Sequence, residues 1–115
     1  MRKSALAGIV IGLLLFSVAC QKMERTPSDK DGAQVWRNLN KLEGPDIAEL
    51  VAFNKVNGSR GEILGVDSYT LYYQAQIRYT RPALGRAAGS LDTWKGEYTF
   101  RKTENGWLGP DNQVY

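Results

Sequence analysis

Residues 68–81 alternate between apolar and polar side chains more regularly than any other stretch of the chain. Successive side chains of a β-strand point to opposite faces, so this period of two predicts a long antiparallel strand with one buried face and one wet face. Pro82 ends the strand because proline has no N–H to donate to a neighbour. The apolar positions are Tyr69, Leu71, Tyr73, Ala75, Ile77 and Tyr79.

Shorter strands are predicted on both sides of this one. Residues 62–66 form a short apolar run in which Gly65 marks a turn or bulge. Residues 94–103 carry aromatic side chains on one face, residues 104–106 predict a hairpin turn, and residues 107–108 return along the sheet. The aromatic residues of that face are Trp94, Tyr98 and Phe100.

Two helices are predicted before the sheet. Residues 33–42 show apolar side chains at helical spacing, with Asp31 as the N-cap. Residues 45–57 show one broad apolar face, with Pro45 in the first turn and Asn57-Gly58 as a stop signal. The sequence therefore predicts an α+β fold, with one or two N-terminal helices packed on a three- to four-stranded antiparallel sheet.

Residues 1–19 read as a secretory signal. Arg2 and Lys3 precede an uncharged, apolar run over residues 5–19, and Ala19 is a small residue at the expected cleavage site. The run is about 15 residues long, shorter than the roughly 20 that a spanning helix needs. An uncleaved signal anchor is the alternative.

Cys20 is the only cysteine of the chain, so it cannot form an internal disulfide. The segment Ser17-Val18-Ala19-Cys20 resembles the lipobox of bacterial lipoproteins, although that family prefers leucine where this chain has Ser17. The resemblance implies cleavage before Cys20, acylation of its sulfur, and a membrane anchor on the periplasmic side. Gln21 in place of aspartate then favours the outer membrane over the inner one.

Residues 20–32 are expected to be the lipidated cysteine and a polar, flexible tether, and residues 33–115 the folded domain. Removal of Arg2 and Lys3 with the leader lowers the net charge from +3 to +1. A chain this close to neutral gives no electrostatic reason to expect nucleic-acid binding.

The sequence offers little material for catalysis. It contains no histidine, and lipidation would use its single thiol, so we expect no catalytic site, no metal site and no cofactor. Glu62, Asp67 and Glu97 lie near tyrosine-rich strands, which leaves one alternative open. In it, a pocket between helix and sheet binds a small ligand or carries a minor enzymatic activity.

Tyr72, Arg78, Arg81 and Arg86 are the candidates for partner binding, because tyrosine and arginine often dominate protein interfaces. Arg81 directly precedes a long loop at residues 82–93, and Arg86 lies within it. The loop is rich in small side chains and is either functional or mobile. We therefore expect a lipid-anchored, non-catalytic binding module that contacts a protein of the cell envelope through the open sheet face and this loop.

Three segments resemble the small cystatin-like and NTF2-like exported domains of bacteria: residues 53–58, 65–69 and 100–107. That family has no single activity, so the resemblance implies a fold and little function. The order of two helices and a sheet also resembles the small lipoprotein of the outer-membrane barrel assembly machine, but that family's glycine-methionine-threonine motif is missing.

Overall fold

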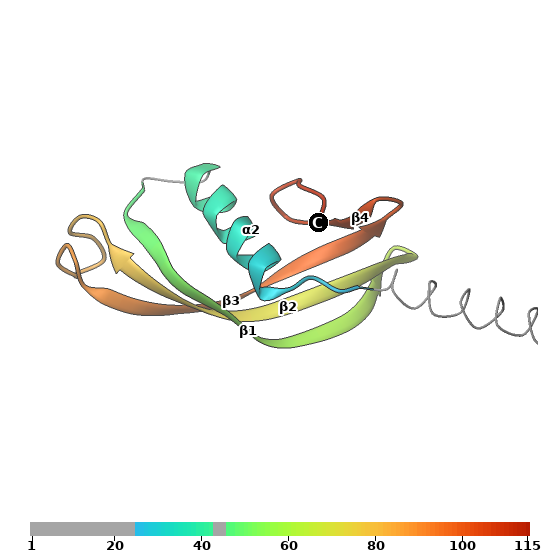
Figure 1. The fold of residues 1–115 in the computed structure, drawn as a ribbon, viewed down its shortest axis with the longest axis horizontal. Coiled ribbons are helices and arrows are strands. Elements are labelled where there is room, and N and C mark those ends of the chain that lie inside the picture. Colours follow the sequence, from blue (N-terminus) through green and yellow to red (C-terminus); the bar gives the residue numbers. More distant parts are fainter. Residues whose placement is uncertain (1–24, 43–45) are drawn as a thin grey trace, which may run out of the picture.

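The computed structural model describes residues 25–42 and 46–115 as an α+β domain with one helix on one face of a four-stranded antiparallel sheet (Figure 1). The strands follow one another in the order β1-β2-β3-β4. The predicted leader and Cys20 lie outside the described residues. The elements are α2 (Asp29–Leu42), β1 (Ala48–Ile63), β2 (Val66–Tyr79), β3 (Leu91–Thr103) and β4 (Gly106–Leu108).

Strand β2 lies at the centre and confirms the alternation predicted from the sequence. Its odd-numbered positions from Tyr69 to Tyr79 face the helix, and all of them except the half-buried Tyr73 are buried. The polar positions between them face away from the helix. Because one helix covers only one side of the sheet, the apolar positions of the alternating pattern identify the side that the helix covers.

The predicted helix over residues 45–57 is wrong, because Ala48–Ile63 forms strand β1 along β2. The register shifts between Leu50 and Ala52 and again between Lys55 and Asn57. Each bulge adds one residue, so Leu50 and Phe53 both face the helix although three positions separate them. Two bulges therefore turned a period of two into a spacing that imitates a helix.

Helix α2 begins at Asp29, four residues before the predicted start. Ser28 caps it, since the Asp31 amide donates to Ser28 Oγ (3.4 Å) and the Ser28 amide donates to Asp31 Oδ2 (3.0 Å). Gly32 lets the helix approach the sheet closely, because a Cβ at this position would come within 2.5 Å of the Phe53 ring.

Residues 25–28 also pack on the domain, so the predicted flexible tether does not extend to residue 32. Pro27 is fully buried, and its carbonyl accepts a hydrogen bond from Lys55 Nζ (3.0 Å). The carbonyl of Arg25 accepts one from the indole N–H of Trp107 (2.7 Å). The chain thus crosses the helix-covered face from β4 to β1 before the helix begins.

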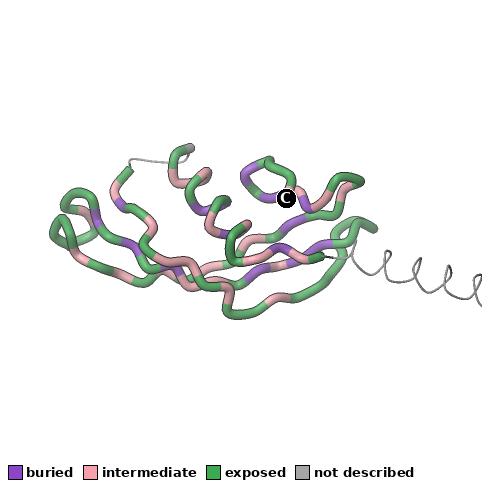
Figure 2. Tube along the Cα trace, viewed as in Figure 1, coloured by how far each residue is buried: buried purple, intermediate pink, exposed green. Residues whose placement is uncertain are grey.

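The core consists of two clusters of buried residues between the helix and the sheet, one around Leu71 and Phe100 and one around Ala75 and Ile77. Figure 2 shows that buried positions occur on both the helix and the strands. A stack of three rings joins the two clusters across β1, β2 and β3. Tyr73 lies between Phe53 and Tyr98, with ring centroids 4.9 and 4.7 Å apart. Offset stacking of this kind adds to the free energy that burial of the rings already supplies.

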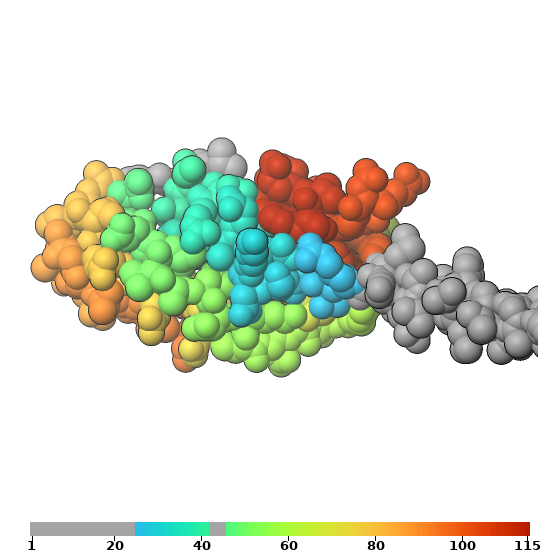
Figure 3. Space-filling view, viewed as in Figure 1, coloured from blue at the N-terminus to red at the C-terminus, as the bar shows by residue number. Residues whose placement is uncertain are grey.

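The C-terminal segment lies beside helix α2 on the same face of the sheet (Figure 3). Asp111 is buried there and accepts hydrogen bonds from Asn38 Nδ2 of the helix (2.8 Å), from the Tyr115 hydroxyl and from the Gln113 amide (3.3 Å). Three donors satisfy this buried carboxylate, so it holds the segment to the helix.

Strand β3 begins at Leu91, three residues earlier than predicted, while the turn at residues 104–105 and the short return strand β4 are confirmed. The predicted turn at Gly65 is also confirmed, as the tip of the β1–β2 hairpin.

Gly58→Ala tests how closely β1 and β2 pack, because a Cβ at this position would lie 1.8 Å from the Tyr69 hydroxyl. Displacing Tyr69 disturbs its packing on Trp107, so we expect the free energy of unfolding to fall by about 1–3 kcal/mol. Urea denaturation measures this value. Gly61→Ala on the same strand is the control, with an expected change within about 0.5 kcal/mol, since its Cβ would approach only Ser68 Oγ (3.2 Å). Equal losses in both variants would contradict the argument.

Candidate functional site

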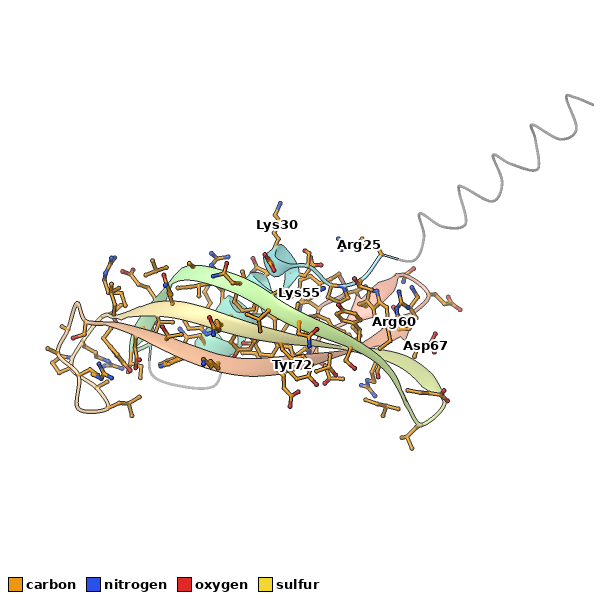
Figure 4. The ribbon with its side chains drawn as sticks, turned by 90° about the horizontal axis from the view of Figure 1, so that it is seen from below. Arg25, Lys30, Lys55, Arg60, Asp67 and Tyr72 are labelled. Carbon is orange, nitrogen blue, oxygen red and sulfur yellow. The ribbon has the colours of Figure 1, made fainter. Side chains whose placement is uncertain are left out.

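The candidate site is the open face, by which we mean the side of β1, β2 and β3 opposite helix α2. Tyr72 lies near its middle and is 37% exposed (Figure 4). Asn57 of β1 and Glu97 of β3 pair with Tyr72 in the strand register and flank it. Its position follows from the alternation of β2, because the side chains of its neighbours, the buried Leu71 and the half-buried Tyr73, point to the helix-covered face.

The rest of the open face is mainly polar. The hydroxyls of Thr70 and Thr99 are hydrogen-bonded across β2 and β3 (3.1 Å). Arg78 pairs with Glu49 across β1 and β2 (3.2 Å), and both side chains are about half exposed. Such pairs contribute little to stability in water, so they leave these groups available to a binding partner.

The loop between β2 and β3 is compactly folded. It contains its own small hairpin, in which the backbones of Ala83 and Arg86 exchange hydrogen bonds of 3.0 and 2.8 Å. At its base the Tyr79 amide donates to the Ser90 carbonyl, and the Gly89 amide donates to the Tyr79 carbonyl. These bonds give residues 80–90 a defined shape at one end of the sheet.

Tyr79 and Asp92 form a polar pair at the base of this loop. The Tyr79 hydroxyl donates to Asp92 Oδ2 (2.8 Å), and Arg86 lies 4.0 Å from Asp92 Oδ1. The hydrogen bond from Tyr79 lowers the pKa of Asp92, and the Thr93 amide lowers it further. Burial, followed by the bond to Asp92, raises the pKa of Tyr79.

The four residues predicted to bind a partner do not form one cluster. Tyr72 and Arg78 share the open face, but six residues of strand put them roughly 20 Å apart. Arg81 is exposed in the loop. Arg86 instead pairs with Asp92, whose side chain lies on the helix-covered side with Tyr79. Tyr72 and Arg78 therefore share the polar face of the strand as predicted, whereas Arg86 lies on the other side of the sheet.

The carboxylates considered for a pocket are all exposed. Glu62 and Asp67 lie opposite each other in the strand register near the tip of the β1–β2 hairpin. Glu97 lies on the open face beside Tyr72. None of the three lies between the helix and the sheet, which is where the small-ligand alternative needs a carboxylate. No observation favours that alternative.

Sequence reasoning missed two leucines that lie in unusual backbone conformations at hairpin tips. Leu64 and Leu84 each have φ 52° and precede a glycine that also has positive φ, as in a type I′ turn. Leu64 is 97% exposed and Leu84 is 74% exposed. A left-handed conformation costs a residue like leucine roughly 1–2 kcal/mol. The signal was present in the two Leu-Gly pairs, where asparagine or aspartate is the usual first residue.

No helix among residues 25–42 and 46–115 is long and apolar enough to cross a membrane. In the same part of the chain, no group of three or more acidic or thiol side chains is arranged to hold a metal ion. Neither a protein-family model, nor a curated protein, nor a solved structure matches this chain.

The Tyr79–Asp92 pair predicts how stability depends on pH. Because the pKa of Asp92 is lowered from 3.8, its contribution is present above about pH 5 and is lost as pH falls through the lowered value. Because the pKa of Tyr79 is raised from 10.0, its contribution is present below pH 10 and is lost as pH rises through the raised value.

We expect Asp92→Asn to be less stable than the wild type at pH 7 and to lose less stability between pH 7 and about pH 3. Tyr79→Phe should in turn flatten the loss above pH 10. The urea midpoint at each pH measures both effects. Parallel pH curves for the wild type and the variants would contradict the coupling.

Proposed function

We propose that this protein is a lipid-anchored, non-catalytic binding module of the bacterial cell envelope. In this proposal acylated Cys20 holds the protein to a membrane on the periplasmic side, the outer membrane in preference to the inner one. The open face then contacts an envelope protein. The absence of histidine from the sequence supports a non-catalytic role.

The observation that supports the proposal is the position of Arg25, where the described chain begins, at one end of the sheet. The Arg25 carbonyl is bound to Trp107 at one end of the sheet, and the loop at residues 80–90 lies at the opposite end (Figure 1). Residues 25–42 run over the helix-covered face only. A chain anchored just before Arg25 therefore presents the whole open face, and the distant loop, away from its attachment point.

The composition of the open face supports protein binding. It combines a central tyrosine, a row of glutamine and threonine side chains, and charged groups of both signs. Aromatic and arginine side chains often supply most of the binding energy at such surfaces, and polar groups around them set the orientation. Three long strands give a broad, gently curved surface (Figure 4).

The cystatin-like or NTF2-like classification of the domain also remains a proposal. One helix laid across an antiparallel sheet of consecutive strands supports it. Because such folds serve many purposes, the classification adds nothing to the functional argument, which depends on the anchor and the open face.

The anchor is tested by the intact mass of the protein purified from bacterial membranes. We expect a chain that begins at Cys20 and is heavier by its acyl groups, because two or more acyl chains are needed for stable anchoring. Cys20→Ala should lose this species. An unmodified chain, cut elsewhere or still carrying Met1, would overturn the lipid anchor.

The open face is tested by photo-crosslinking in intact cells. A photoreactive residue at Tyr72 should capture a discrete envelope protein. The same residue at Arg37, which is exposed on the helix side of the domain, is the matched control and should capture it weakly or not at all. Tyr72→Ala should abolish the association with little loss of stability, because Tyr72 is outside the core. Equal capture from both positions would contradict binding through the open face.

A further inference from the structure

The tip of the β1–β2 hairpin is an exposed apolar surface. Ile63 and Val66 pair at the end of the two strands and are 40% and 41% exposed, and Leu64 between them is 97% exposed. We call Ile63, Leu64, Gly65 and Val66 the apolar tip. A type I′ turn in water normally carries asparagine or aspartate where this one carries Leu64. The turn therefore keeps a leucine at a position where the backbone favours a small polar residue.

The apolar tip projects from the same end of the domain at which Arg25 is bound. The Arg25 carbonyl is hydrogen-bonded to Trp107, whose ring packs on Tyr69, and Tyr69 pairs with Arg60 of β1. Figure 4 shows Arg25 toward this end of the sheet together with Arg60 and Asp67, and Figure 1 shows the β1–β2 turn at the same end. Leu64 follows Arg60 by four residues, so the tip reaches roughly 13 Å beyond the level of Arg25.

The chain length before Arg25 matches this distance. Five residue steps separate Cys20 from Arg25. A fully extended chain covers at most about 18 Å in five steps. A membrane that holds the acyl chains of Cys20 is thus within reach of the apolar tip, and the tip projects far enough to meet it.

We propose that the apolar tip inserts into the lipid bilayer beside the acylated Cys20 and forms a second, weaker membrane contact. This inference rests on the proposed lipid anchor. Leu64 enters the interface between headgroups and acyl chains, with Ile63 and Val66 at its rim. Two points of attachment would orient the domain on the membrane, so that the open face always meets its partner at the same angle.

The charges behind the tip limit how deeply it enters. Glu62 and Asp67 face each other one position behind Ile63 and Val66, and both are exposed. Carboxylates stay hydrated and are repelled by anionic headgroups, so insertion stops at about one residue. It follows that a larger fraction of anionic lipid does not deepen insertion, in contrast to a surface bound through basic residues.

The experiment uses the mature lipoprotein, purified from membranes and reconstituted in vesicles of phosphatidylethanolamine and phosphatidylglycerol. Once Cys20 is acylated, Leu64→Cys supplies the only free thiol for an environment-sensitive fluorophore. Leu84→Cys is the matched control, since Leu84 has the same φ of 52° and precedes a glycine in the same way. It belongs to the loop at residues 80–90, which lies at the other end of the domain (Figure 1). Nitroxide groups on the lipid acyl chains quench a fluorophore that is in the bilayer.

We expect the label at position 64 to emit at shorter wavelength and to lose most of its emission to the nitroxide lipids, and the label at position 84 to do neither. A water-like, unquenched label at position 64 overturns the inference while an acylated mass upholds the anchor. A label that is shielded in native membranes but not in pure lipid vesicles also overturns it, in favour of a protein contact at the tip.

The mass of the same preparation separates the two proposals. An unmodified Cys20 overturns the lipid anchor of the proposed function. The leader could then still hold the chain in the membrane. In that case the same emission and quenching measurements, made with the label at position 64 in a Cys20→Ala variant, test whether the apolar tip enters the bilayer. A chain found free of membranes overturns both.

Discussion

The structure depends on the ring stack of Phe53, Tyr73 and Tyr98 beneath a single helix. One helix cannot cover a sheet with strands of 13 to 16 residues, so the helix-facing side must be buried in large part by its own aromatic side chains. The stack connects the two core clusters across three strands, and the close contact of Gly32 with Phe53 brings the helix down onto it. Aromatic area replaces the second layer that a larger domain would have.

This arrangement makes the two faces and the two ends of the sheet physically different. One face is closed by the helix, by the segment at residues 25–28, of which Pro27 is buried, and by the C-terminal segment that Asp111 holds in place. The other face has no covering element among the described residues, and it carries polar groups with Tyr72 near the centre. The end at Arg25 carries the apolar tip, while the opposite end carries the ordered loop at residues 80–90. A partner site and a membrane contact can therefore occupy separate surfaces of a small domain.

The sequence predicted the regular parts of the fold better than the irregular ones. Strand β2 and the hairpin around residues 104–105 were predicted because nothing interrupts their local patterns. Strand β1 was taken for a helix because two bulges, near Val51 and Val56, inserted residues into its alternation. The helix start was missed because Ser28 lies in a polar stretch that resembles a linker, and only its packing shows otherwise. The four candidate binding residues are exposed, but they do not lie on one surface, because Arg86 turns toward Asp92 on the helix-covered side.

The sequence by itself determined the α+β class, the face of β2 that is buried and the single cysteine on which the anchoring proposal depends. Those features are local, since side-chain alternation and the identity of each residue need no distant contact. Only the tertiary structure decided that β1 is a strand, that Arg86 turns to Asp92 and that Arg25 and Leu64 lie at the same end. Each of these depends on contacts between residues far apart in the chain, and the free energy of those contacts outweighs the local preference.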